Sequence, residues 1–417
     1  MSSDTTRAST TAKNGPLSGI RVLDLSRILA GPTATQLLGD LGADIIKIEH
    51  PIRGDDTRKW GPPYLKGKDD KNTHESAYYL AANRNKRSVT IDISNPGGAK
   101  LVRQLLKKCD ILLHNFKVGG LEKYGLGYDD LKSEFPSLVY CAITGFGQTG
   151  PYAPQAGYDF LAQGIGGIMS LTGTPDGEPV KVGVGIADIM CGMYASTAIL
   201  AALRHSDQTG HGQMIDLALL DTQVAWLANE ANNYFLSGDV PKRRGNAHPN
   251  IVPYQVFPTE DGHFILAVGN DSQFQKFCNF AEAPKLPFDK RFATNDLRIR
   301  NRDELIPLIE KMTLLKTTDQ WIKGLSSIGV PSGPVNNLEQ TFKDPQIKHR
   351  NMRITMDQPL AKTGKIDLLG NPVKFSATPV TYRRPPPTLG EHTADVLEEL
   401  LGITKDEQQK LRAQGLI

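Results

Sequence analysis

The sequence predicts an α/β protein, with a Rossmann-like large domain built on a parallel sheet and a smaller α+β domain. Short apolar strands alternate with helical segments in the first half of the chain. Strands joined by helical crossovers form parallel sheets with helices on both faces. The 417 residues also exceed the usual size of one hydrophobic core. We therefore expect two domains.

The elements of the large domain follow from their apolar patterns, in order from Ile20. Strands are expected at 20–25, 44–49, 88–93, 110–114 and 138–143, and helices at 33–41, 97–108 and 128–134. Asn95-Pro96 opens the second of these helices. An apolar segment from Met193 to Leu203 also has helical character.

The pattern changes after the turn at 210–213. Residues 214–219 lead into a helical stretch around 225–234, and 254–257 with 263–268 alternate as a hairpin around Asp261-Gly262. Helical segments follow to Ser327, and an amphipathic stretch at 393–411 closes the chain. We expect a disordered tail at 1–15, the large domain at 16–220 with 350–417, the small domain and a linker helix at 221–330, and a connector at 331–349.

Composition argues against several classes of partner. The chain carries 48 basic and 45 acidic residues, a net charge of +3, without a dense basic run, so no nucleic-acid partner is expected. No apolar run approaches the ~20 residues that span a bilayer. The four cysteines are widely spaced without a CxxC pair, which argues against a zinc site or a disulfide framework. We expect no metal, no membrane partner, and a location in the cytoplasm or the mitochondrial matrix.

Asp188 is the first candidate functional residue. It is a lone carboxylate between the glycine-rich segment 182–185 and the helical segment that follows. At or near a helix N-terminus, unpaired N–H groups and the helix dipole favour the ionised form, and the glycines leave room for a large ligand. A carboxylate that a substrate can reach is a potential nucleophile. A capping role is the alternative, and this segment alone leaves both open.

The first strand, loop, helix and second strand have the layout of a dinucleotide site. The loop reads Ala30-Gly31-Pro32-Thr33-Ala34-Thr35, with a single glycine where the NAD fingerprint needs GxGxxG. An NAD-dependent oxidoreductase is therefore a disfavoured alternative.

Basic residues near strand ends indicate a phosphorylated, extended ligand. Lys86 and Arg87 precede a strand, Asn115-Phe116-Lys117 follows another, and Lys123 comes shortly after. Arginine and lysine bind phosphates through bidentate and point-charge contacts, and open α/β sheets bind ligands at the carboxyl ends of their strands. For each segment alone, a solvated loop is the alternative.

Read together, the segments resemble the class III CoA-transferases, the formyl-CoA transferase and carnitine CoA-transferase family, from residue 16 to about residue 401. The resemblance is carried, in order, by 22–25 with 30–32, 41–49, 54–58, 83–86, 144–147 with 150–151, 156–159, 209–213, 253–254 and 330–331. Within the family, segments 55–58, 60–63, 148–151 and 251–255 are most similar to those of succinyl-CoA:glutarate CoA-transferases.

The resemblance implies an enzyme that moves CoA from a donor such as succinyl-CoA to a carboxylic acid. The expected acceptor is a dicarboxylic acid similar to glutarate. It makes Asp188 the nucleophile, which passes through an aspartyl anhydride and an aspartyl-CoA thioester. It implies that CoA thioesters are substrates, without a resident cofactor, and that two chains form an interlocked homodimer. Backbone N–H groups of the segment 182–185 or of the loop 245–248 are expected to stabilise oxyanions.

The resemblance also implies which residues bind the substrates. Positions that hold CoA in relatives correspond to Lys86, Arg87, Asn115, Phe116, Lys117 and Lys123. From the residues themselves, the candidates for binding a distal carboxylate are Arg27, Arg58, Arg84 and Arg244. Our choice among them is Arg27, because it lies at the carboxyl end of the first strand. Leu29 stands where the formyl transferase has a polar glutamine, which favours a longer, apolar-stemmed acid. Asp159 and His248 are further candidate contacts, with structural roles as the alternatives.

The same fold serves α-methylacyl-CoA racemases, the main alternative function. Proton exchange at the α-carbon needs a paired acid and base, and racemases have a histidine where this chain has Tyr158. Tyrosine, with a reference pKa near ~10, is a poor base, so a transferase is favoured. A non-enzymatic CoA-binding module would need no nucleophile, so the presence of Asp188 argues against it.

Overall fold

The computed structural model describes residues 15–417, so the tail expected at 1–15 lies outside them except for Gly15. The chain divides into two compact units. Of the described residues, the first unit comprises 15–167, 182–226 and 345–417, and the second comprises 168–181 and 227–344. Most of the expected connector belongs to the second unit, because its strand β11 (Ser332–Pro334) pairs with that unit's sheet.

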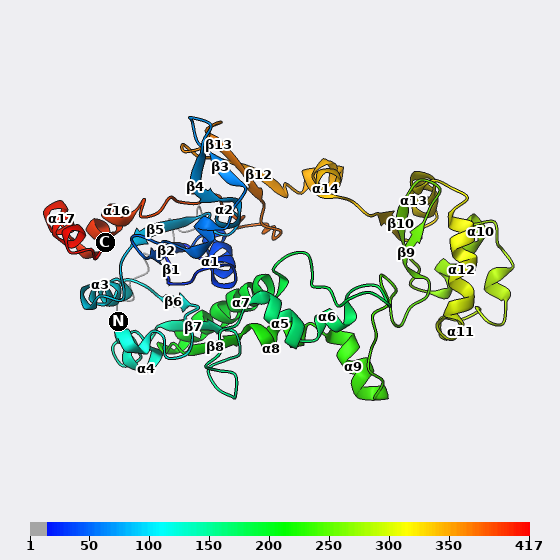
Figure 1. Cartoon of the computed structure of the whole chain (residues 1–417), viewed down its shortest axis with the longest axis horizontal. Coiled ribbons are helices and arrows are strands. Elements are labelled where there is room, and N and C mark those ends of the chain that lie inside the picture. Colours follow the sequence, from blue (N-terminus) through cyan, green and yellow to red (C-terminus); the bar gives the residue numbers. More distant parts are fainter. Residues whose placement is uncertain (1–14) are drawn as a thin grey trace, which may run out of the picture. The chain divides into compact units, whose positions relative to one another are not determined.

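A six-stranded sheet forms the middle of the first unit, in the order β5-β2-β1-β6-β7-β8 (Figure 1). Its strands are β1 (Arg21–Asp24), β2 (Asp44–Glu49), β5 (Lys86–Thr90), β6 (Ile111–His114), β7 (Val139–Thr144) and β8 (Met214–Ala218). All neighbouring strands are parallel, which confirms the predicted sheet. The sequence predicts residues 214–218 only as the approach to a helix. They form an edge strand instead, hydrogen-bonded along β7.

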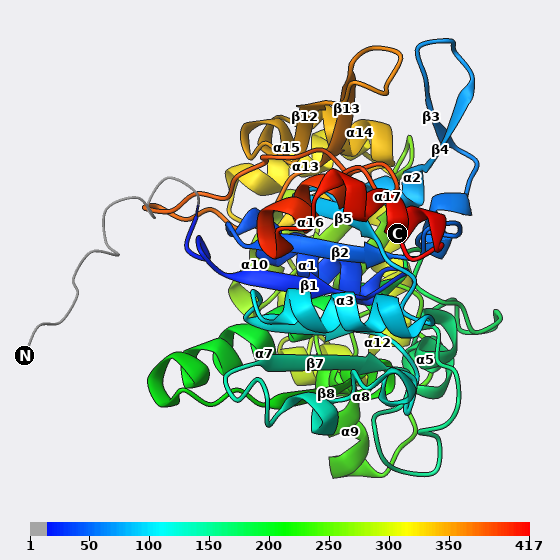
Figure 2. The ribbon, with the colours of Figure 1, turned by 90° about the vertical axis from the view of Figure 1, so that its left-hand side faces the viewer.

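Helices cover both faces of this sheet. Helices α3 (Pro96–Leu106) and α16 (Thr393–Leu401) lie on one face, and α1 (Ala30–Asp40) and α7 (Ile186–Thr209) pack on the other (Figure 2). Alternate residues of a strand point to opposite faces. Accordingly, Leu23 and Ile46 belong to the core with α3 and α16, whereas Val22 and Ile45 belong to the core with α1 and α7.

Helix α7 is the central helix on its face. A Cβ atom at Gly192 would lie 2.6 Å from the carbonyl oxygen of Ala30, so the glycine lets α7 pack directly on the start of α1. By length and composition α7 could also cross a membrane, but half of its apolar window is buried (50%) inside the fold. That burial is what a core helix shows.

The first unit carries smaller elements around this framework. They are η2 (Asp56–Lys59), β3 (Tyr64–Lys66), β4 (Asn72–Ser76), α2 (Ala77–Ala81), η3 (Glu122–Tyr124), α4 (Tyr128–Leu131), α5 (Asp159–Ile165), α8 (Leu219–Ala225), α15 (Pro345–His349), β12 (Arg353–Asp357), β13 (Lys365–Leu369) and α17 (Lys405–Ala413). The pairs β3–β4 and β12–β13 are antiparallel. The sequence reading missed both pairs.

The second unit is built on an antiparallel sheet in the order β11-β10-β9, with β9 at Tyr254–Pro258 and β10 at His263–Ala267. This confirms the predicted hairpin. Its helices are α6 (Ile168–Leu171), α9 (Ala228–Ser237), α10 (Asp271–Phe280), η4 (Leu286–Phe288), α11 (Asn295–Arg300), α12 (Arg302–Thr313), α13 (Thr318–Ser327) and α14 (Leu338–Lys343). The fully buried Trp321 stacks on Phe264 and contacts Phe277 at the centre of the core.

Candidate active site

The strand order places a crevice between β1 and β6. From β1 the strands run outward through β2 and β5 on one side, and through β6, β7 and β8 on the other. In open α/β sheets, ligands bind where the order reverses, beside the carboxyl ends of the strands. A cavity of about 340 Å³ lies there, lined by Arg27, Ile28, Ala30, Asp56, Asn115, Phe116, Lys117, Ile143, Thr144, Gly145, Ala153, Gln155, Ala156, Gly157, Tyr158, Asp188 and Leu219.

The loops after β1 and β6 are joined to each other beside the cavity. The backbone N–H of Arg27 donates to the side-chain oxygen of Asn115 at 2.9 Å, and the Asn115 amide donates to the carbonyl of Arg27 at 2.7 Å. The Nδ1 atom of the buried His114 accepts the N–H of Phe116 at 3.2 Å. These bonds fix the backbone that presents Arg27, Asn115 and Phe116 to the cavity.

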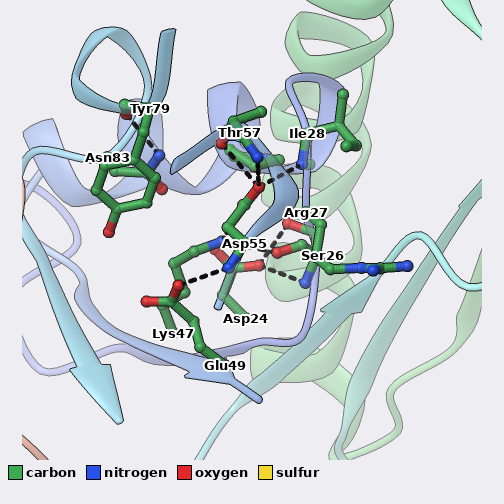
Figure 3. Close-up of polar contacts among 12 residues, drawn as sticks. Asp24, Ser26, Arg27, Ile28, Lys47, Glu49, Asp55, Thr57, Tyr79 and Asn83 are labelled. Atoms are coloured by element: carbon green, nitrogen blue, oxygen red, sulfur yellow. Dashed lines mark hydrogen bonds and ion pairs between the residues drawn. The ribbon is translucent and has the colours of Figure 1, made fainter. Parts of the chain in front are cut away.

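Asp55 holds the loop after β1 from the other side (Figure 3). Ile28 has φ of 72°, a strained conformation for a β-branched residue. Its N–H donates to Asp55 Oδ1 at 3.2 Å, while the ammonium group of Lys47 donates to Asp55 Oδ2 at 2.9 Å. Thr57 donates to the same carboxylate through its N–H and its hydroxyl. The buried Lys47–Asp55 pair therefore fixes the loop that leads into α1.

Two glycines bring the backbone segments after β7 and before α5 together beside the cavity. A Cβ atom at Gly145 would lie 2.4 Å from Cα of Gly157, and one at Gly157 would lie 2.2 Å from Cα of Gly145. Any side chain at either position would collide with backbone. This close approach explains why both segments contain glycine.

Asp188 lies in this cavity, but it does not cap its helix. The first helical residue of α7 is Ile186 and its N-cap is Gly185, so Asp188 is the third helical residue, beyond the capping position. Asp159, from the start of α5, supplies the cap. Its Oδ1 accepts the N–H of Ala187 at 2.7 Å and that of Asp188 at 3.3 Å. The capping interpretation of Asp188 is therefore wrong, and the side chain of Asp159 caps α7 instead.

The expectation that the start of the helix keeps Asp188 ionised is also wrong, because the pKa of this carboxyl is raised and not lowered. The residue is 8% exposed, and burial raises its pKa to about 7, with a further contribution from the negative charge of Asp159. Desolvation disfavours the charged carboxylate, and a nearby like charge acts in the same direction. At neutral pH, Asp188 is therefore divided between its acid and its carboxylate.

Three predicted ligand residues of the loop after β6 share the cavity with Asp188: Asn115, Phe116 and Lys117. Arg27 lines it too, with its guanidinium paired to Asp56 at 2.8 Å and over the ring of Phe116. Lys117 is exposed and forms no ion pair within residues 15–417. Leu29, half-buried, lies beside the start of α7, where a Cβ at Gly185 would meet its side chain at 3.1 Å.

Lys86 and Arg87 are not brought to the cavity. The amine of Lys86 is fully buried and donates to Pro32 O at 3.0 Å and to Asn83 Oδ1 at 2.9 Å, near Asp24. Arg87 pairs with Asp44 and Glu399. Both buried cations have partners within the unit. Their role in holding CoA therefore stays a prediction without support from this geometry.

Lys123 lines a third cavity, which adjoins a second one that in turn adjoins the first. The second cavity, of about 250 Å³, shares Arg27, Asp56 and Phe116 with the first. It shares Ile93, Ser94 and Tyr124 with the third, of about 380 Å³. The lysine and arginine side chains that line these two cavities are Arg27, Arg53, Lys100, Arg103 and Lys123.

The remaining expected contact, His248, belongs to the second unit, where its ring packs against Tyr254. Sequence reasoning missed Tyr78, on α2. Burial and the charges of Asp188 and Asp159 raise the pKa of Tyr78 to about 12. No sequence pattern identifies it, because α2 is a single short helix between a hairpin and β5. Within residues 15–417, no group of three or more His, Cys, Asp or Glu side chains is arranged to hold a metal ion.

The chain belongs to the CoA-transferase family III, whose sequence profile matches residues 17–393. It is 50% identical over 391 residues to the succinate–glutarate CoA-transferase of Agrobacterium fabrum, covering 94% of this chain and 97% of that protein. It is 43% identical over 402 residues to the succinyl-CoA:glutarate CoA-transferase of Homo sapiens, covering 96% of this chain and 90% of that protein. The crystal structure of a CAIB/BAIF family protein from Brucella suis matches with a TM-score of 0.81 and 49% identity, covering 93% of this chain and all (100%) of that one.

We predict that Asp188→Asn makes the protein more stable at alkaline pH. The folded state keeps a proton on Asp188 that the unfolded chain releases, so wild-type stability falls as pH rises from 3.8 to about 7. This shift corresponds to at most about 4 kcal/mol. Asparagine has no charge to bury, so the free energy of unfolding from urea titration at pH 8 should be higher for the variant than for the wild type. At pH 5 the difference in this free energy should be much smaller. An equal difference at both pH values would contradict the burial effect.

Proposed function

We propose that this chain transfers CoA from succinyl-CoA to a dicarboxylic acid of the glutarate type, with Asp188 as the nucleophile. The observation that carries the proposal is the buried carboxylate of Asp188 in the cavity at the strand-order reversal. The relatives reported above are named for succinate or succinyl-CoA and for glutarate. No histidine lines the cavity among the described residues, so the proton exchange of a racemase is not favoured.

The proposed reaction proceeds by acyl transfer through two covalent intermediates. One oxygen of ionised Asp188 attacks the thioester carbonyl carbon of succinyl-CoA, the C–S bond breaks, and its electron pair leaves with the CoA thiolate. The thiolate attacks the Asp188 carbonyl carbon of the anhydride, forming an aspartyl-CoA thioester and releasing succinate. The acceptor carboxylate then attacks this thioester, and the same steps in reverse give the new acyl-CoA and free Asp188.

Backbone N–H groups at the start of α1 are our choice for stabilising the oxyanions of these steps. The early N–H groups of α7 already have acceptors. Ile186 donates to Val184 O, and Ala187 and Asp188 donate to Asp159. Ala30 lines the cavity as the first residue of α1, and the first N–H groups of a helix have no acceptor within it. They also carry the positive end of the helix dipole.

The three adjoining cavities suit a CoA thioester, which is a substrate in this proposal and not a resident cofactor. CoA is long and carries phosphates. Its thiol end would lie at Asp188, and its phosphates would lie along the cations of the second and third cavities, which include Arg53 and Lys123. The cation at Lys123 lies 4.7 Å from the centre of the Tyr124 ring, and Tyr124 lines both of those cavities.

We also propose an intracellular location, cytoplasmic or in the mitochondrial matrix, and an interlocked homodimer. All four cysteines are free thiols, as in reducing compartments. Large apolar side chains on α7 are exposed in the single chain, among them Met193, Tyr194 and Leu200. Contact with a second chain would bury them.

The covalent step is tested by mass. Incubation of the protein with succinyl-CoA alone should add the mass of CoA less one water to the chain, because one Asp188 oxygen leaves with succinate. Hydroxylamine should then convert the thioester at Asp188 to a hydroxamate. Asp188→Ala, shown to be folded by circular dichroism, should form neither product. The same products in Asp188→Ala, or at another residue, would overturn the assignment of the nucleophile.

Substitution of two basic residues of the cavity tests which of them binds the distal carboxylate of the acceptor. The Arg27–Asp56 pair is half exposed, with 48% and 47% of the side chains accessible, and exposed pairs are weak, so a substrate carboxylate can take the place of Asp56. Arg27→Ala should raise the KM for glutarate about tenfold or more, since a bond to a charged group contributes about 1.5–3 kcal/mol. Lys117→Ala, the matched control, should leave this KM near wild type. The reverse pattern would transfer the role to Lys117.

A further inference from the structure

Asp159 connects three segments at the start of the nucleophile's helix. Its Oδ1 accepts the N–H groups of Ala187 at 2.7 Å and Asp188 at 3.3 Å. Its Oδ2 accepts the side-chain amide of Gln163, one turn along α5, at 2.7 Å. The carbonyl oxygen of that amide accepts the N–H of Val182 at 2.9 Å. The pair of side chains therefore fixes both the first turn of α7 and the glycine-rich segment before it.

We propose that Asp159 is a positioning residue for Asp188. It fixes the first turn of α7 and places a negative charge near the nucleophile, which favours the covalent, uncharged forms of Asp188. The inference rests on the proposed function, because it requires Asp188 to form an anhydride and a thioester. Asp159 itself bonds to backbone and to Gln163 and needs no contact with the reacting atoms.

The charge argument follows from the balance of the reaction. Free Asp188 carries a negative charge that is repelled by Asp159 in a site where burial weakens screening. When Asp188 attacks the thioester, the negative charge leaves with the CoA thiolate. When the thiolate attacks the anhydride, the negative charge leaves with the released carboxylate. Repulsion by Asp159 therefore raises the free energy of the enzyme with ionised Asp188 relative to both covalent intermediates. It raises that free energy by the same amount relative to the enzyme with protonated Asp188.

Other charged and titratable groups around Asp188 do not reproduce this arrangement. Those that face it or line its cavity are Tyr78 on α2, Cys191 one turn along α7, Tyr158 before α5, Asp56 on η2, and the cations Arg27 and Lys117. Helix α1 has no titratable side chain before its last residue, Asp40, and α8 has only the exposed Asp221. Of the nearby charges, that of Asp159 is the one that raises the pKa of Asp188.

The test compares Asp159→Asn with the wild type. Asparagine keeps an oxygen that can accept the N–H groups of α7 but removes the charge. The acid limb of the pH profile of kcat/KM should move from near pH 7 to lower pH by about one unit. Intact mass at pH 8 with succinyl-CoA measures the ratio of CoA-bound to free enzyme. This ratio should fall by about tenfold, which is the equivalent of a shift of one pH unit.

Two further variants separate charge from anchoring and from general stability. Gln163→Ala loosens the support without changing a charge, so it should lower kcat while leaving the acid limb in place. Asn95→Ala removes the cap of α3, where Asn95 accepts the N–H of Gly97 at 3.0 Å. It should lower the melting temperature without moving the acid limb. This control identifies effects that come from stability alone.

Each outcome distinguishes the inference from the function on which it rests. A folded Asp159→Asn protein that forms the adduct with an unmoved acid limb and an unchanged adduct ratio overturns the inference and leaves the function intact. A wild-type protein that forms no adduct at Asp188 overturns both. An equal shift of the acid limb in Asn95→Ala would assign the effect to stability and also overturn the inference.

Discussion

The reversal of strand order between β1 and β6 is the constraint on which the rest of the site depends. It leaves the loops after these two strands beside one another with a crevice between them. The loops then bond to each other through Arg27 and Asn115. Because α7 packs on the start of α1 through Gly192, the same constraint brings Asp188 to the crevice. The position of Asp188, the proposed nucleophile, therefore follows from the topology and one close helix contact.

Buried charge maintains this geometry. Lys47 pairs with Asp55, and Arg58 bridges Glu49 and Glu75, all with almost no exposed side-chain area. Removing one partner of such a group leaves an uncompensated buried charge, which is strongly destabilising. The Asp55 carboxylate connects this network to the strained backbone of Ile28 (Figure 3). Asp188 is the contrasting case, a carboxylate buried in the cavity beside another carboxylate, with its pKa raised to about 7.

The sequence predicted the parallel sheet and the segments around Asp188, because strand periodicity and family motifs are local signals. It missed β12–β13, whose short strands have mixed polarity. It left a capping role open for Asp188, because the side chain that caps the helix comes from Asp159, 29 residues away in the chain. Lys86 and Arg87 looked like free cations, since sequence does not show the burial and partners that Asp24, Asp44 and Glu399 provide. Local chemistry was predictable, whereas pairing between distant segments was not.

The most direct test of the account follows an oxygen atom. In the proposed reaction, an oxygen of the acceptor carboxylate becomes an oxygen of Asp188 when the thiolate regenerates the enzyme. Turnover with succinyl-CoA and glutarate labelled with oxygen-18 should therefore label the tryptic peptide Val182–Arg204, in which Asp188 is the only acidic side chain. Label in that peptide, located at Asp188 by fragmentation, is the predicted result. Turnover with product formed and no label in that peptide would contradict covalent catalysis by Asp188.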